Sequence, residues 1–177
     1  MTTTATVPAT TTRSAHVLDF EALYRSSRDD VFAYAATLLR DPTAAEDVTA
    51  AAFERAYRKR GSYRPARGSR RAWLFGIARN AALDELRRRN RSAAMTADPE
   101  DLDAARPDDE AEAALRRAAL RAALAGLAPR EREVIALKFH AGLDNTELAA
   151  VLGVSVSNAG TLLHRAVTAL RKAIDEH

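Results

Sequence analysis

The sequence predicts an all-α protein: two small helical domains joined by a flexible acidic linker, with a helix-turn-helix in the C-terminal domain. Alanine is abundant and runs of β-branched residues are scarce, which favours helix along most of the chain. Apolar residues recur at three-and-four spacing on both sides of one acidic stretch that contains two prolines. A chain of 177 residues, 47% hydrophobic, is long enough for one medium core or two small ones.

Composition also excludes several classes of function. The chain has no cysteine, which excludes disulfides and thiolate chemistry and fits a cytoplasmic location. No apolar run approaches the length of a membrane span, so no membrane insertion is expected. The four histidines share no metal-ligand spacing, and no glycine-rich phosphate loop or nucleophile motif is present. We therefore expect no enzyme, no catalytic residues, no metal and no cofactor.

The predicted first domain covers residues 17–91 and follows a disordered tail, residues 1–16, that is rich in Thr and Ala. Asp19 is placed to cap a first helix, and Asp41 followed by Pro42 is typical of the start of a second. The second helix has an inner stripe of small and apolar residues: Ala45, Val48, Thr49, Ala52, Phe53 and Ala56.

A basic loop and a long helix follow. Gly61, Pro65 and Gly68 interrupt the helical pattern, and a helix is expected from Ser69 to Arg91. Between 55 and 91 thirteen basic residues face two acidic ones, and the only tryptophan, Trp73, lies among them. Arginine next to aromatic residues suits a surface that holds phosphates and stacks on bases, with Tyr63, Trp73 and Phe75 as possible stacking surfaces. The alternatives are a solvated basic face and a Trp73 packed in the core.

The predicted linker, residues 92–110, contains two prolines and carries most of an acidic run of eight residues that ends at Glu112. Helical periodicity resumes in the second domain, residues 111–177, through leucines at 115, 120, 124 and 127. Asp144 with Glu147 forms a capping box, Gly153 suits a tight turn, and Ser155 suits the cap of a second helix. This is the pattern of a helix-turn-helix, although an ordinary helical hairpin has similar spacing. The inner face of its second helix is expected to comprise Val156, Leu163, Ala166 and Leu170.

Five ordered segments resemble the extracytoplasmic-function (ECF, group 4) sigma factors of bacterial RNA polymerase. They are Phe20 to Leu23, "AEDVTAAAFERAY", "WLFGIARNAALDELRRRNR", "REREVIALKFHAGLDNTELAAVLGVS" and "LLHRA". The resemblance implies that residues 17–91 bind core polymerase and open the promoter −10 element, and that residues 111–177 recognise the −35 element. The chain departs from the family pattern at two places. Glutamine and glutamate are frequent where it has Ala50 and Ala51, and many members carry basic residues where it has Gly160, Leu162 and Val167.

The resemblance also implies a role for individual residues and a set of partners. The residues expected to bind core polymerase are Glu46, Asp47, Glu54 and Arg55. Those expected at the −10 element are Arg60, Ser62, Tyr63, Arg64, Arg67, Arg70, Arg71, Trp73, Arg79, Asn80, Asp84, Arg87 and Arg88. Those expected at the −35 element are Ser155, Ser157, Asn158, Thr161, His164 and Arg165. The implied partners are the β and β′ subunits of core RNA polymerase, promoter DNA and an anti-sigma factor. The rival interpretation is a stand-alone helix-turn-helix regulator that needs no polymerase contact.

Overall fold

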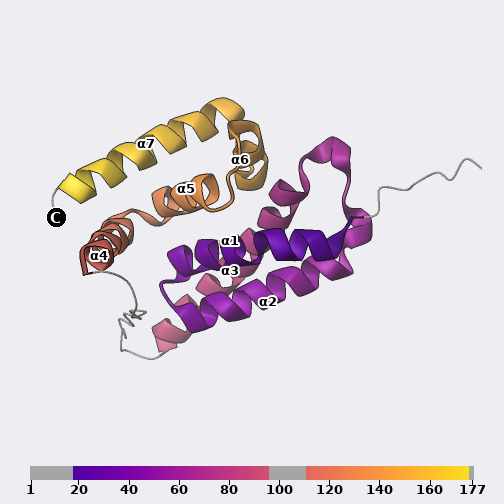
Figure 1. Cartoon of the computed structure of the whole chain (residues 1–177), viewed down its shortest axis with the longest axis horizontal. Coiled ribbons are helices and arrows are strands. Elements are labelled where there is room, and N and C mark those ends of the chain that lie inside the picture. The colour runs from indigo at the N-terminus through magenta and orange to yellow at the C-terminus, as the bar shows by residue number, and fades with distance from the viewer. Residues whose placement is uncertain (1–17, 96–110, 176–177) are drawn as a thin grey trace, which may run out of the picture.

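The computed structural model describes residues 18–95 and 111–175, and every regular element in these two ranges is helical (Figure 1). The first range contains α1 (Phe20–Leu39), α2 (Pro42–Arg58), the short 3₁₀ turns η1 (Arg60–Ser62) and η2 (Pro65–Arg67), and α3 (Arg70–Met95). The second contains α4 (Ala111–Gly126), α5 (Pro129–Phe139), α6 (Asn145–Leu152) and α7 (Val156–Asp175). The predicted all-α class is confirmed. The predicted tail and most of the predicted linker lie outside the described residues, while residues 92–95, expected in the linker, continue α3.

The helix starts in the first domain follow the capping residues that the sequence predicts. The Asp19 carboxylate accepts the N–H of Ala22 at 3.0 Å, and the Asp41 carboxylate accepts the N–H of Ala44 at 3.1 Å. Each cap satisfies a backbone donor that the first turn of a helix leaves without a partner. The end of α1 was not predicted: Arg40 adopts a left-handed backbone conformation, with φ of 56°, at the turn into α2.

The core of the first domain is where α1, α2 and α3 pack together (Figure 1). The whole predicted inner stripe of α2 is buried. The rings of Tyr34 on α1 and Phe75 on α3 meet edge to face at 5.7 Å, and neither has exposed surface. Phe75 therefore packs in the core and offers no stacking surface to a base, which corrects the expectation from the sequence.

The second domain is organised around α5, α6 and α7. Leu137, Leu143 and Leu148 are fully buried there, and α7 leaves α6 at an angle of 98°. Gly153 joins the two helices with φ of 68°, the left-handed conformation for which a glycine was expected. Val156 is 48% exposed, so the predicted inner face of α7 is wrong at its first position; Ala159 and Ala166 are the buried residues of this helix. The bend between α6 and α7 is that of a helix-turn-helix.

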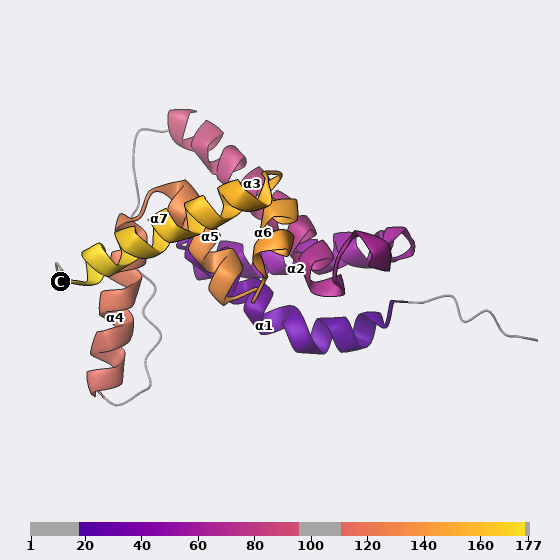
Figure 2. The same cartoon turned by 90° about the horizontal axis from the view of Figure 1, so that it is seen from above.

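The two domains are in contact with each other. Helices α5 and α6 lie against α1 and α3, as both views show (Figures 1 and 2). Helix α4 contacts α7 and crosses it near the C-terminal end of that helix (Figure 2), and its Leu115 is 71% exposed. The sequence does not reveal the contacts at this boundary. Arg79 pairs there with Glu133, Arg71 donates to the carbonyls of His140 and Ala141, and Ser69 donates to Glu147.

The N-cap of α2 makes part of the stability of the first domain depend on pH. The hydrogen bond from the Ala44 N–H, and then the Arg89 guanidinium at 2.6 Å, lower the pKa of Asp41. A carboxyl whose pKa is lower in the folded state stabilises the fold above its unfolded pKa of about 3.9, and that contribution is lost as the pH falls through the folded pKa.

We expect Asp41→Asn to flatten this part of the pH dependence, because asparagine still caps the helix but carries no charge for Arg89. Urea unfolding at pH 7 and at pH 3 measures the effect. The variant should be less stable than the wild type at pH 7, and the difference should shrink at pH 3. An equal difference at both pH values would contradict the assignment.

Candidate nucleic-acid interface

The basic loop between α2 and α3 is closed by hydrogen bonds to its own backbone. The Arg64 guanidinium donates to the Gly61 carbonyl at 2.7 Å, and the Tyr63 hydroxyl donates to the Gly68 carbonyl at 3.2 Å. Gly68 has φ of 139°, a conformation that favours glycine. The loop thereby presents a row of exposed arginines at one end of the first domain: Arg60, Arg64, Arg67 and Arg70.

The aromatic residues near this loop divide into packed and exposed rings. Trp73 is partly buried and tilts against the ring of Tyr63 at 5.7 Å. Tyr57, at the end of α2, is 51% exposed, and the guanidinium of Arg60 lies over its ring at 4.0 Å from the centroid. Sequence reasoning missed Tyr57; an aromatic residue three positions before Arg60, at the edge of the loop, was the available signal. An arginine over an exposed aromatic ring offers a cationic and aromatic surface on which an unpaired base can stack.

Helix α3 carries the other residues predicted at the −10 element, and they do not share one face. Asn80 is exposed, whereas Arg71 and Arg79 point towards the second domain. Asp84 forms ion pairs with Arg55 of α2 at 3.1 Å and with Arg87 at 3.2 Å. Asp84 thus connects the residues predicted to bind DNA with those predicted to bind polymerase.

Further along α3, Arg88 has an acidic neighbour on its own helix. It pairs with Glu85 at 2.7 Å, and this contact lowers the pKa of Glu85. Arg87 and Arg88 keep about two thirds of their side-chain surface exposed. Both guanidiniums therefore remain accessible to a phosphate.

The residues predicted to bind polymerase lie on the outer side of α2. Glu46, Asp47, Glu54 and Arg55 are all exposed, opposite the buried stripe of the same helix. Glu54 accepts a hydrogen bond from Arg58 at 2.6 Å. The four predicted residues and Asp84 form a surface of mixed charge. Such a surface fixes the register of a protein partner.

The predicted −35 residues cluster at the start of α7. The Ser155 hydroxyl caps this helix by accepting the N–H of Asn158 at 3.2 Å. The Asp144–Glu147 capping box at the start of α6 is present, with contacts of 2.8 and 3.1 Å. All six predicted residues are exposed: Ser155, Ser157, Asn158, Thr161, His164 and Arg165. The second helix of a helix-turn-helix reads bases with residues near its N-terminus, and these side chains are free to do so.

Two further findings bear on function. In the described part of the chain, no group of three His, Asp or Glu residues is placed to hold a metal ion. Within the same residues, no single helix is long and apolar enough to cross a membrane; α6 and α7 meet that length and composition only when counted together across their 98° bend.

Comparison with known proteins agrees with this arrangement. Residues 23–92 match the family model described as sigma-70 region 2, and residues 117–170 match sigma-70 region 4. The chain is 33% identical over 156 residues to "ECF RNA polymerase sigma factor SigL" of Mycobacterium tuberculosis, covering 88% of each chain.

Two solved structures have the same fold. The sigma factor RpoE of Bartonella quintana, in complex with the anti-sigma factor NepR, has a TM-score of 0.77 at 23% identity over 89% of this chain and 97% of that one. CnrH, in complex with the cytosolic domain of CnrY, has a TM-score of 0.65 at 27% identity over 89% of this chain and 88% of that one. The order of the two matched regions, the helix-turn-helix geometry of the second and the identity over most of the chain together show that this protein belongs to the ECF sigma factors.

Proposed function

We propose that this protein binds core RNA polymerase and directs it to promoters, with α6 and α7 recognising the −35 element and the region from α2 to α3 recognising and opening the −10 element. The observation that carries the proposal is the presence, on one chain, of a helix-turn-helix with an exposed reading face and a basic loop with an exposed aromatic ring. Duplex recognition and strand capture require these two different surfaces.

The outer side of α2 is the proposed polymerase surface, with Glu46, Asp47, Glu54 and Arg55 contacting the β′ subunit. The second domain would complete the attachment through the β subunit. Ala50 is exposed on the same helix and offers no polar contact. The ion pair between Arg55 and Asp84 supports a single rigid surface formed by α2 and α3.

At the −10 element, we assign phosphate contacts to the loop arginines, to Arg87 and Arg88 and, once the domains separate, to Arg71 and Arg79. Base contacts fall to Asn80 and to the Arg60–Tyr57 pair, whose flat exposed surface suits a base flipped out of the duplex. Tyr63 and Trp73 stabilise the loop, because their rings pack on each other and join the loop to α3. Ser62 stabilises the loop by donating to the Lys59 carbonyl at 2.7 Å.

At the −35 element, Asn158 is assigned to a base edge and Arg165 to a phosphate. Ser155, Ser157, Thr161 and His164 surround them on the exposed side of α7. Gly160 and Leu162 provide no charge, so fewer phosphate contacts are expected here than in members with basic residues at these positions.

An anti-sigma factor is a further proposed partner. The RpoE structure contains the anti-sigma factor NepR, and the CnrH structure contains the cytosolic domain of CnrY. The protein would act in the cytoplasm, where promoter and polymerase meet, and would use no cofactor, metal or catalytic residue of its own.

Reconstituted transcription tests the proposal. Core polymerase with this protein should start RNA at a discrete site on a promoter template, and neither component alone should do so. The rival interpretation, a stand-alone regulator, predicts instead that the protein alone retards duplex promoter DNA and fails to bind core polymerase. That result would overturn the proposed function.

A further inference from the structure

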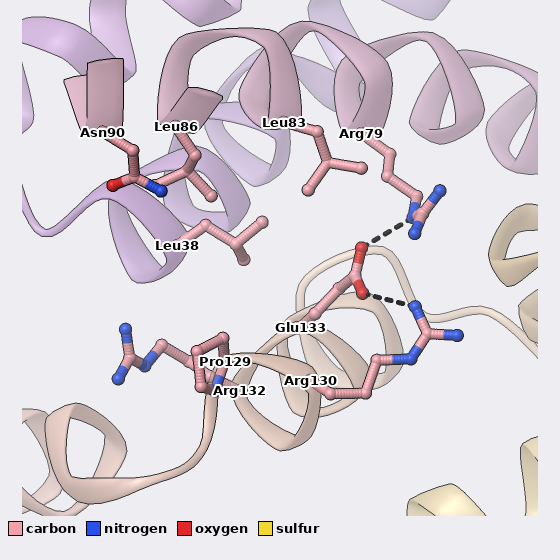
Figure 3. A pocket seen from close by; sticks show the side chains of 9 residues that line it. All are labelled: Leu38, Arg79, Leu83, Leu86, Asn90, Pro129, Arg130, Arg132 and Glu133. Atoms are coloured by element: carbon pink, nitrogen blue, oxygen red, sulfur yellow. Dashed lines mark hydrogen bonds and ion pairs between the residues drawn. The ribbon is translucent and has the colours of Figure 1, made fainter. Parts of the chain in front are cut away.

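The contact between the two domains covers residues of α3 that are proposed to bind DNA. Arg79 of α3 and Glu133 of α5 form an ion pair between the domains, with their side chains 2.6 Å apart (Figure 3). Arg130 holds the other oxygen of the same carboxylate at 2.9 Å. The side chain of Glu133 is 7% exposed and that of Arg79 18%. A buried carboxylate held by two arginines presents them with the charge and the oxygen geometry of a phosphate.

Arg71 is engaged by the second domain in a similar way, two helical turns earlier on α3. Its guanidinium donates to the carbonyls of His140, at 2.8 Å, and Ala141, where α5 ends. Carbonyls at the end of a helix carry partial negative charge. Arg71 also pairs with Asp30 of its own domain at 2.5 Å. Two arginines proposed to bind DNA are thus both occupied by negative groups of the second domain.

Apolar residues of both domains belong to one core, and further polar contacts also cross this boundary. The Ser69 hydroxyl at the start of α3 donates to Glu147, the capping residue of the helix-turn-helix. The Thr37 hydroxyl lies 3.1 Å from Nε2 of His140. Polar contacts of this kind are replaced by water at little net cost, which suits a boundary that separates.

Packing beside the ion pair is incomplete. A groove of about 450 Å³ separates α3 from α5, with Leu38, Leu83 and Leu86 on one side and Pro129 on the other (Figure 3). The Tyr34 hydroxyl is buried with no hydrogen-bond partner within the described residues. Burial raises the pKa of Tyr34 far above its ordinary value, and the Glu133 carboxylate contributes to the increase while Arg79 opposes it. The Tyr34 ring packs against Phe75 in the core of the first domain, so the unpaired hydroxyl is a local defect of that core.

The closed arrangement is incompatible with promoter binding by both domains. Elements centred 25 base pairs apart lie about 85 Å from each other along the duplex, at about 3.4 Å per base pair. Domains joined by direct side-chain contacts cannot occupy both sites, so these contacts must break before both domains engage DNA.

We propose that the free protein is held closed by the Arg79–Glu133 contact, and that the Glu133 carboxylate occupies the place on α3 that a promoter phosphate takes once the domains separate. The inference rests on the proposed role of the α3 arginines in DNA binding. It makes the second domain a competitor of single-stranded DNA for the same surface, so that opening regulates access to Arg71 and Arg79.

Förster resonance energy transfer between two dyes on the free, full-length chain measures how often the two domains are in contact. Because the natural sequence has no cysteine, the exposed residues Ala22 on α1 and Ala150 on α6 can be changed to cysteine and labelled with a dye pair. Glu133→Gln and Arg79→Gln should each lower the transfer efficiency, and the double variant should be no more open than either single variant, because both remove the same contact. Glu21→Gln, which removes an exposed ion pair with Arg25, is the matched control and should change nothing.

Competition by DNA is measured with a 20-nucleotide oligothymidylate. Adding it should lower the transfer efficiency of the wild type. If the wild type is open one time in ten, Glu133→Gln should bind the oligonucleotide about tenfold more tightly, since it no longer has to open first.

Wild-type transfer efficiency and wild-type oligonucleotide affinity in folded Glu133→Gln would overturn the inference. Circular dichroism establishes folding. If Glu133→Gln unfolds the second domain, the transfer efficiency of Arg79→Gln, which changes the first-domain side of the same contact, decides the question alone. Polymerase takes no part in these measurements. A chain that closes but does not direct initiation would contradict only the proposed function, and one that directs initiation but is open when free would contradict only this inference.

Discussion

Replacing Arg67 and Arg70 together with glutamine is expected to lower the rate of open-complex formation on duplex promoter DNA by about a hundredfold. Both residues are exposed at the end of the basic loop, where it meets α3. A charged hydrogen bond contributes about 1.5–3 kcal/mol, and exposed side chains fall at the lower end of this range. Two such contacts then amount to about 3 kcal/mol, or a factor of about a hundred. Loss of two phosphate contacts should also reduce the slope of log affinity against log salt concentration by about two.

A template with a pre-melted bubble distinguishes opening from binding. If the loop arginines act by stabilising separated strands, most of the lost activity should return on this template, because the cost of melting is already met. Arg25→Gln with Arg28→Gln on α1 removes the same charge from outside the loop and should change the rate less than twofold. An equal loss on duplex and bubble templates would contradict a role in opening.

Replacing Asn158 or Arg165 with alanine is expected to impair recognition of the upstream element, with little effect on strand opening. Each change should weaken binding by roughly 1–3 kcal/mol, or about 5- to 150-fold, if the side chain makes a good base or phosphate contact. Asn158→Ala should reduce discrimination between promoter sequences, whereas Arg165→Ala should weaken binding to all of them and reduce its salt dependence.

The same helix supplies the control. Arg171 is exposed six residues after Arg165, about 9 Å further along α7. Arg171→Ala removes the same chemical group beyond the last of the predicted reading residues and should leave upstream recognition unchanged. Footprinting of the upstream element by the polymerase complex measures all three variants. Equal losses for Arg165→Ala and Arg171→Ala would indicate a diffuse charge effect rather than a defined reading face.

Local features of the fold were predictable because they depend on neighbours in sequence. Asp19, Asp41 and Ser155 cap the helices that they were expected to cap, and Gly153 adopts the left-handed turn conformation. These outcomes follow from the hydrogen-bonding capacity of a side chain a few residues from a helix start, or from the absence of a Cβ atom.

Features that depend on distant parts of the chain were not predictable. The exposure of Tyr57 and the burial of Phe75 are decided by which helices cover each ring, and periodicity alone gives the two rings similar status. The pairing of Arg79 with Glu133 joins residues 54 positions apart in different domains. The sequence indicates that α3 is strongly basic but not that part of this charge is already neutralised by the second domain.

Genome-wide sequencing of transcript 5′ ends tests the central claim most directly. Core polymerase reconstituted with this protein and supplied with genomic DNA from its own source should produce transcripts that begin at a limited set of positions. These positions should share two upstream sequence elements at a fixed separation, one read by each domain. Transcripts that start no more selectively than those of core polymerase alone would contradict the account.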